Sequence, residues 1–169
     1  MFDDLVLGVD PGVARLGLAV VGRRGRTASL VWSDTVRTSA DLDEAERLGT
    51  LAAAVRAAIA VHVPTSVAVE RVAFNRNQVS ALTVARATGA VMVVAAEAGL
   101  AVEEYSPTQV KDAVTGMGNA DKAQVHRALV RVHGLRDVPE QPDAADAVAV
   151  ALTHLTGARA RAAARSGAR

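Results

Sequence analysis

Cysteine is absent from the 169 residues of this chain, and aromatic residues make up only 2% of it. Without thiols the chain can form no disulfide, no thiolate zinc site and no cysteine nucleophile. With so few rings, a hydrophobic core must be built from Ala, Val and Leu, and the chain is 50% hydrophobic. A chain of this length suits one domain with its own core. We therefore expect a single domain over residues 1–169.

Long hydrophobic runs are also missing. The longest, residues 90–102, is interrupted by Glu97 and Gly99 and falls short of the ~20 apolar residues that a membrane span requires. The first residues do not resemble a secretory signal peptide, because Asp3 and Asp4 precede the apolar run there. We therefore expect a cytoplasmic protein without membrane contact.

The formal net charge is only +1, so the overall balance does not predict a nucleic-acid partner. The charges are unevenly distributed, however, because the segments 15–37 and 157–169 are both rich in Arg and poor in acids. Such a local surface can bind phosphates, although a basic run is also typical of a solvated face or tail. We expect the Arg-rich tail to be disordered from about residue 162.

Apolar runs bounded by turn residues predict five strands. The second and third are separated by a short Gly-containing turn, which is typical of a β-hairpin, so the first three strands should be consecutive and antiparallel. The fourth ends on Glu70, just as the first ends on Asp10. The strands are expected over residues 5–10, 16–22, 30–36, 66–70 and 100–105.

Apolar residues recurring at intervals of three and four predict five helices. The first would be capped by Ser39 or Asp41 and would end before Pro64. Three strands followed by helical crossovers predict an α/β fold, a five-stranded mixed sheet with helices on both faces, which is the ribonuclease H-like arrangement. The helices are expected over residues 41–61, 77–98, 107–114, 120–132 and 141–161.

Four carboxylates fall on this scaffold where they could meet. Asp10 and Glu70 would lie on one edge if their strands are parallel neighbours, and that edge collects ligands in open α/β sheets. Asp143 and Asp146 are three residues apart at the start of the last helix and share one face. Each feature also has a simpler explanation, because Asp10 could open a turn and the two helical acids could complement the helix dipole.

Together, the four acids predict a metal site. Converging carboxylates repel one another unless a hard divalent cation lies among them. A set without His or Cys favours Mg²⁺ or Mn²⁺ over zinc. Two such ions ~3.5 to 4 Å apart can hold the attacking and leaving oxygens of a phosphoryl displacement, and four acids supply enough ligands for them.

Short motifs follow one another along the chain in an ordered set that is more specific than any single member. With these motifs the sequence resembles the RuvC family of Holliday junction resolvases, also called crossover junction endodeoxyribonucleases, over nearly its whole length. The motifs are Gly8-Val9-Asp10-Pro11-Gly12 with Gly17, Val69-Glu70 with Phe74, Ser106-Pro107 through Val110-Lys111, Gly116, Gly118, Ala120-Asp121-Lys122-Ala123-Gln124-Val125 and Asp143-Ala144-Ala145-Asp146-Ala147.

The resemblance implies a homodimeric, Mg²⁺-dependent nuclease that resolves four-way DNA junctions in recombination and repair. It would cut by paired symmetric nicks with two ions per active site, leaving 5′-phosphate and 3′-hydroxyl ends. The helix at 77–98 matches the dimer-forming helix of the family, and a two-fold dimer suits a two-fold junction. A branch-migration complex of the RuvA and RuvB type is a candidate further partner. The implied metal ligands and catalytic acids are Asp10, Glu70, Asp143 and Asp146.

The resemblance also implies three residues that contact the DNA. Lys111 and Lys122 match basic residues that hold the scissile phosphate region, with Lys122 also catalytic because it steadies the phosphate charge. Exposed helical lysines are the simpler explanation of both. Phe74 would stack on an unpaired base, or else belong to the core beside the following helix.

Three other functions remain open at this point. The chain could be another ribonuclease H-like nuclease that acts on RNA, although the segments around Phe74, Lys111 and Lys122 favour the resolvase. It could be a sugar kinase or actin-like ATPase, but those proteins enclose ATP between two such domains. A non-catalytic junction-binding protein would gain nothing from acids beside DNA phosphates.

Overall fold

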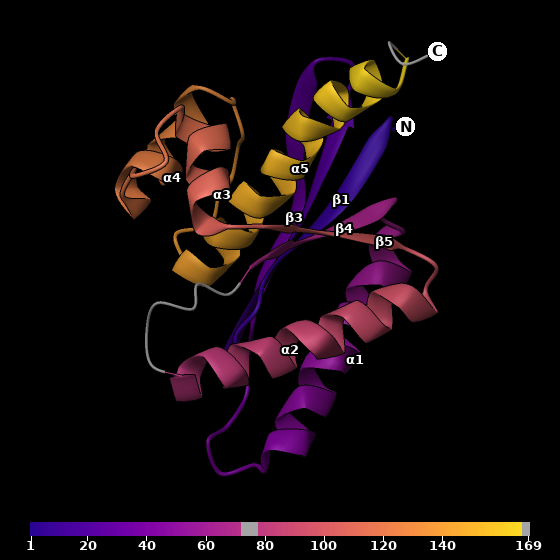
Figure 1. The fold of residues 1–169 in the computed structure, drawn as a ribbon, viewed down its shortest axis with the longest axis vertical. Coiled ribbons are helices and arrows are strands. Elements are labelled where there is room, and N and C mark those ends of the chain that lie inside the picture. Colours follow the sequence, from indigo (N-terminus) through magenta and orange to yellow (C-terminus); the bar gives the residue numbers. More distant parts are fainter. Residues whose placement is uncertain (72–77, 167–169) are drawn as a thin grey trace.

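One sheet contains all five predicted strands. The computed structural model describes residues 1–71 and 78–166 of the chain. The strands lie in the order β3-β2-β1-β4-β5 (Figure 1). The strands are β1 (Asp4–Asp10), β2 (Arg15–Arg24), β3 (Thr27–Arg37), β4 (Ser66–Glu70) and β5 (Ala101–Tyr105).

The sheet is mixed, as the sequence predicts. β1, β2 and β3 form consecutive antiparallel pairs, whereas β4 pairs in parallel with both β1 and β5. The β2–β3 register shifts by one residue between Val20 and Val21. A shift of this kind is a β-bulge, which reverses the alternation of side chains beyond it.

Five helices accompany the sheet in the described part of the chain, but the predicted cap of the first is wrong. Asp43 caps α1, because its side chain accepts from the backbone N–H of Glu46 while the Glu46 side chain accepts from that of Asp43. This reciprocal capping box outcompetes Ser39 and Asp41, whose side chains hydrogen-bond each other instead. The helices are α1 (Glu44–His62), α2 (Gln78–Glu97), α3 (Pro107–Thr115), α4 (Lys122–Arg131) and α5 (Pro142–Ser166).

The last helix is longer than predicted. α5 continues to Ser166, whereas the sequence pattern places its end at Arg161 and the start of a disordered tail at about residue 162. The segment beyond Arg161 is rich in Ala, the residue with the highest helix propensity. The division of the chain into one domain and a disordered tail stays a prediction. No helix in the described part of the chain is long and apolar enough to cross a membrane.

Helices cover both faces of the sheet (Figure 1). α1 and α2 lie on one face, where they bury Leu7 and Val9 of β1. α3, α4 and α5 lie on the other, where Val6 joins their core and Gly8 touches α5. Because side chains alternate along a strand, Asp10 belongs to the face that α5 covers.

Two glycines let α5 lie directly on the sheet. A Cβ atom at Gly8 would be 2.1 Å from the carbonyl oxygen of Ala147, and one at Gly17 would be 1.9 Å from that of Asp143. Any other residue would push the helix away. Since Gly17 is paired with Asp10, this contact brings the first turn of α5 to the end of β1.

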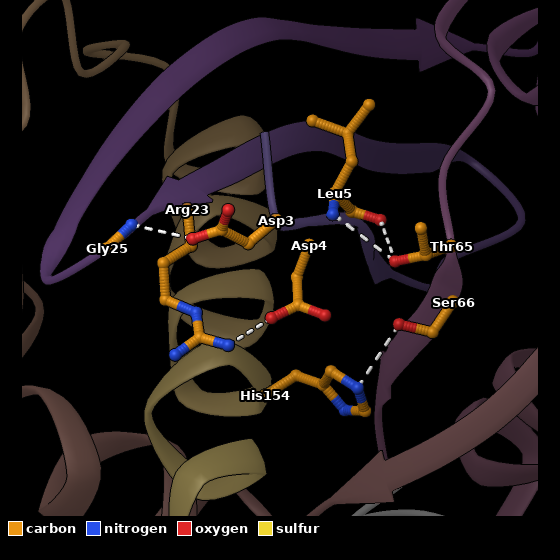
Figure 2. Close-up of polar contacts among 8 residues, drawn as sticks. All are labelled: Asp3, Asp4, Leu5, Arg23, Gly25, Thr65, Ser66 and His154. Atoms are coloured by element: carbon orange, nitrogen blue, oxygen red, sulfur yellow. Dashed lines mark hydrogen bonds and ion pairs between the residues drawn. The ribbon is translucent and has the colours of Figure 1, made fainter. Parts of the chain in front are cut away.

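At the opposite end of the sheet, where β1 begins, polar side chains are paired with one another. Asp4 of β1 forms an ion pair with Arg23 of β2 (Figure 2). Ser66 of β4 lies 3.2 Å from Nε2 of His154, and the Tyr105 hydroxyl lies 3.0 Å from Nδ1 of the same ring. The ion pair joins β1 to β2, and His154 joins α5 to β4 and to Tyr105, the last residue of β5.

Candidate active site

Asp10 and Glu70 lie side by side, as predicted. β1 and β4 are parallel neighbours in which Val9 is paired with Val69, so the next residue of each strand is the carboxylate at its end. The two side chains share a hydrogen bond, which raises the pKa of Glu70 and lowers that of Asp10. A hydrogen bond between two carboxyl groups requires a proton on one of them.

The first turns of α5 bring two further acids to this edge. Asp143 lies in the first turn and Asp146 one turn later. The charges of both raise the pKa of Asp10, and the charge of Asp146 also raises that of Glu70. The structure thus places the other three predicted acids within electrostatic reach of Asp10.

Burial and mutual repulsion make this cluster unfavourable in its fully charged form. Desolvation is the largest cause that raises the pKa of Asp10 to about 7, followed by the charges of Asp146 and Asp143. Desolvation followed by the charge of Asp10 raises the pKa of Glu70 to about 8. A carboxyl group that holds its proton near neutral pH lacks a sufficient cationic partner.

Lys122 is the cation that lowers the pKa of Asp10 and Glu70. It is the first residue of α4, and Asp121 caps this helix. Its Nζ atom lies 2.5 Å from Oδ2 of Asp146. Desolvation lowers the pKa of Lys122, but the hydrogen bond to Asp146 and its charge outweigh that effect, so the pKa is raised overall.

A cleft of about 230 Å³ is lined by two of the four acids and by both predicted lysines. Lys111 reaches it from α3, which begins at the capping residue Ser106. Glu70, Asp146 and Lys122 line the same cleft. The predicted acids and lysines therefore occupy one site, whereas Phe74 lies outside the described residues.

Oxygen ligands dominate this site, and their chemistry fits a hard divalent cation. The raised pKa values of Asp10 and Glu70 point the same way, because a cation among the four acids would relieve their repulsion. In the described part of the chain, no group of three or more His, Asp or Glu side chains has a geometry that could hold a metal ion. The carboxylates instead make the Asp10–Glu70 and Lys122–Asp146 contacts described above.

Sequence reasoning noted the basic segment 15–37 but assigned no role to its members. The structure places Arg15 and Arg37 opposite each other at the same end of the sheet as the acids. The pairing of residues across the predicted hairpin could have indicated that the two arginines are neighbours. The bulge at Val20 and Val21 shifts the register by one residue, however, and this shift cannot be read from the sequence.

The fold and the site define a class of protein. A five-stranded mixed sheet in this order, with helices on both faces and carboxylates at the ends of β1 and β4, is a ribonuclease H-like fold with an acidic site of the divalent-metal type.

Comparison with known proteins gives the particular family. The family model described as crossover junction endodeoxyribonuclease RuvC matches residues 6–154. The RuvC protein of Nocardioides sp. is 48% identical over 160 residues, covering 92% of this chain and 90% of the relative. That of Heliobacterium modesticaldum is 44% identical over 148 residues, covering 88% and 91%.

A solved structure agrees with the sequence relatives. Thermus thermophilus RuvC in complex with a Holliday junction substrate is 41% identical and has a TM-score of 0.86. The match covers 92% of this chain and 95% of the Thermus thermophilus chain. The chain belongs to the RuvC family, which confirms the resemblance found in its motifs. It is thus a nuclease, and the family implies dependence on a divalent metal ion.

Proposed function

We propose that this chain resolves four-way DNA junctions by paired symmetric nicks, in homologous recombination and repair. The observation that carries the proposal is the edge where four acids and two lysines meet, in a chain of the RuvC family. The junction substrate of the Thermus thermophilus relative supports it. A DNA substrate also agrees with the cytoplasmic location that the sequence predicts.

The proposed cofactor is Mg²⁺, with two ions per active site. When bound, Mg²⁺ supplies Lewis-acid chemistry, which generates a nucleophile from water and stabilises negative charge on a phosphate. The chain contributes the oxygen ligands and a partly desolvated setting in which charges interact strongly. The residues that would hold the ions are Asp10, Glu70, Asp143 and Asp146.

The two lysines have separate roles in the proposal. Lys122 steadies the negative charge of the scissile phosphate, because its side chain is exposed and its Nζ atom already faces the acids. Lys111, on the α3 wall of the cleft, binds the DNA backbone as a point charge. Cleavage leaves 5′-phosphate and 3′-hydroxyl ends.

We also propose that the chain acts as a homodimer through α2. On this helix Leu82 and Val93 are 54% and 57% exposed, and a Cβ atom at Gly89 would meet no neighbour. An exposed apolar stripe with a glycine between its large residues suits close packing against a second copy. A branch-migration complex of the RuvA and RuvB type remains a further proposed partner.

The experiment that tests the function compares three substrates side by side with Mg²⁺, Mn²⁺ and EDTA. The substrates are a mobile four-way DNA junction, a linear duplex and an RNA–DNA hybrid. We expect paired, symmetric nicks that occur only in the junction and require the metal. Metal-dependent cutting of the hybrid would instead assign the site to RNA, and binding of the junction without cutting would indicate a non-catalytic protein.

A further inference from the structure

Arg15 and Arg37 are directly opposite each other at the ends of β2 and β3. Both side chains are exposed. They lie at the same end of the sheet as the acidic site, because Gly17 is paired with Asp10 and Arg15 is two residues beyond Gly17. Two residues of extended strand correspond to about 7 Å.

Both arginines project from the face of the sheet that carries the acids. Gly17 touches α5, so Arg15, two residues earlier on β2, lies on that same face. Ala28 and Leu30 of β3 also contact the core on this face. The bulge then reverses the alternation, which places Arg37 beside Arg15.

The pairing of two cations is unfavourable for the protein alone. Like charges directly opposite each other destabilise a sheet. Neither Arg15 nor Arg37 has an ion pair or a side-chain hydrogen bond within residues 1–71 and 78–166. Asp34 of β3 is paired with Leu18 and lies on the opposite face.

The backbone around this pair is held in place. The loop residue Thr38 donates its N–H to the carbonyl of Ala14 at 3.2 Å and its hydroxyl to that of Val13 at 2.6 Å. Arg47 of α1 donates its Nε–H to the Thr38 hydroxyl at 2.9 Å. A fixed backbone holds the two side chains on adjacent positions, so less conformational entropy is lost when a ligand binds between them.

We propose that Arg15 and Arg37 together bind one DNA phosphate beside the acidic site. Guanidinium groups form paired hydrogen bonds with phosphate oxygens, and a phosphate between them would neutralise their repulsion. A displacement of about 7 Å corresponds to the axial rise of about two nucleotides. The phosphate therefore lies within a few nucleotides of the cut. This inference rests on the proposed function, because it requires a DNA substrate at the acids.

The test is the salt dependence of junction binding by the full-length chain, measured in Ca²⁺ or EDTA so that cutting does not interfere. Arg15→Ala and Arg37→Ala should each weaken binding about tenfold, and the double variant should reduce the salt slope by about 1, the value for one phosphate. Arg24→Ala is the matched control, because Arg24 is exposed on the same strand at the other end of the sheet. It should leave the slope unchanged.

A junction with one neutral methylphosphonate, moved stepwise along the strand around the cut, identifies the phosphate. At one position the methylphosphonate should weaken junction binding by the parent chain as much as the double substitution does. At that same position it should cause no further loss of binding by the double variant. Because Ala removes the repulsion between the two cations, the variants should unfold at the same or a higher temperature than the parent.

Four outcomes would overturn the inference. A slope reduced by about 2 in the double variant would mean two separate phosphates. Losses of junction affinity equal to that of Arg24→Ala would mean that the two arginines make no specific contact. Methylphosphonate effects that are identical in the parent and the double variant would mean the same. In both cases, junction cutting by the parent would still support the proposed function. A parent that neither prefers nor cuts the junction would overturn both.

Discussion

The two ends of the sheet differ in how their charged residues are paired. Where β1 begins, Asp4 is paired with Arg23, and Ser66 contacts His154 (Figure 2). Where β1 ends, the half-buried Asp10 faces other acids, with Lys122 as its cationic neighbour. Folding alone favours the first arrangement, because unpaired buried charges are costly. The second arrangement therefore indicates function.

The largest expected difference between the ends comes from two matched substitutions. Asp10→Asn should abolish cleavage, a loss of at least about 100-fold, while junction binding is kept or strengthened because a negative charge is removed. Asp4→Asn should leave cleavage unchanged but cost about 1 kcal/mol of stability, because it leaves Arg23 without its ion-pair partner. Cleavage rates and urea unfolding measure both effects. Retained nicking by Asp10→Asn would contradict the assignment of the site.

A second substitution damages the acidic end without altering any acid. Gly17→Ala would place its Cβ atom against the Asp143 carbonyl, so the first turn of α5 must move away. We expect a loss of cleavage of about 100-fold, since a displacement of about 1 Å can have that effect. Gly49→Ala is the control, because a Cβ atom there meets no neighbour. Equal cleavage by both variants would show that the contact does not position the site.

The pH dependence of stability should also differ between the ends. The folded-state pKa values of Asp10 and Glu70 are raised to about 7 and about 8 from 3.8 and 4.5, so their protonated forms stabilise the fold. That contribution is complete below about pH 4 and is lost as the pH rises through 7 to 8. In EDTA the melting temperature should therefore fall as the pH rises from about 4 to 8. Mg²⁺ should restore the melting temperature at pH 8.

The variant Asp10→Asn sharpens the pH experiment. It removes one titrating acid and lowers the repulsion on Glu70, so its melting temperature should change less between pH 5 and 8 than that of the parent. Asp4→Asn should follow the parent curve with a constant offset. Parallel curves for the parent and Asp10→Asn would contradict the raised pKa of this pair.

The smallest expected effect concerns a single phosphate contact. Lys111→Ala should weaken junction binding and reduce the salt slope by about 1, because Lys111 lines the cleft beside Glu70 and Asp146. Arg24→Ala, at the other end of the sheet, should not change it. An unchanged slope for Lys111→Ala would show that this lysine touches no phosphate.

Local patterns predicted most of the fold. The strand that ends on Glu70 was predicted with the observed bounds, because apolar runs and turn residues act over a few neighbouring positions. The cap of α1 was misplaced because several acceptors compete within five residues, and geometry selected Asp43. The end of α5 was predicted too early, since Ala-rich segments can continue a helix that tertiary contacts have already started.

The sequence by itself determined which residues form the acidic site, because strand ends and helix starts can be read from local patterns. Only the tertiary structure decided how they meet. The contact between Gly17 and α5 positions Asp143, and it joins segments far apart in the chain. Counting back from the hairpin turn pairs Arg15 with Val36, whereas the bulge pairs it with Arg37. A bulge depends on how both faces of the sheet pack, which no local pattern records.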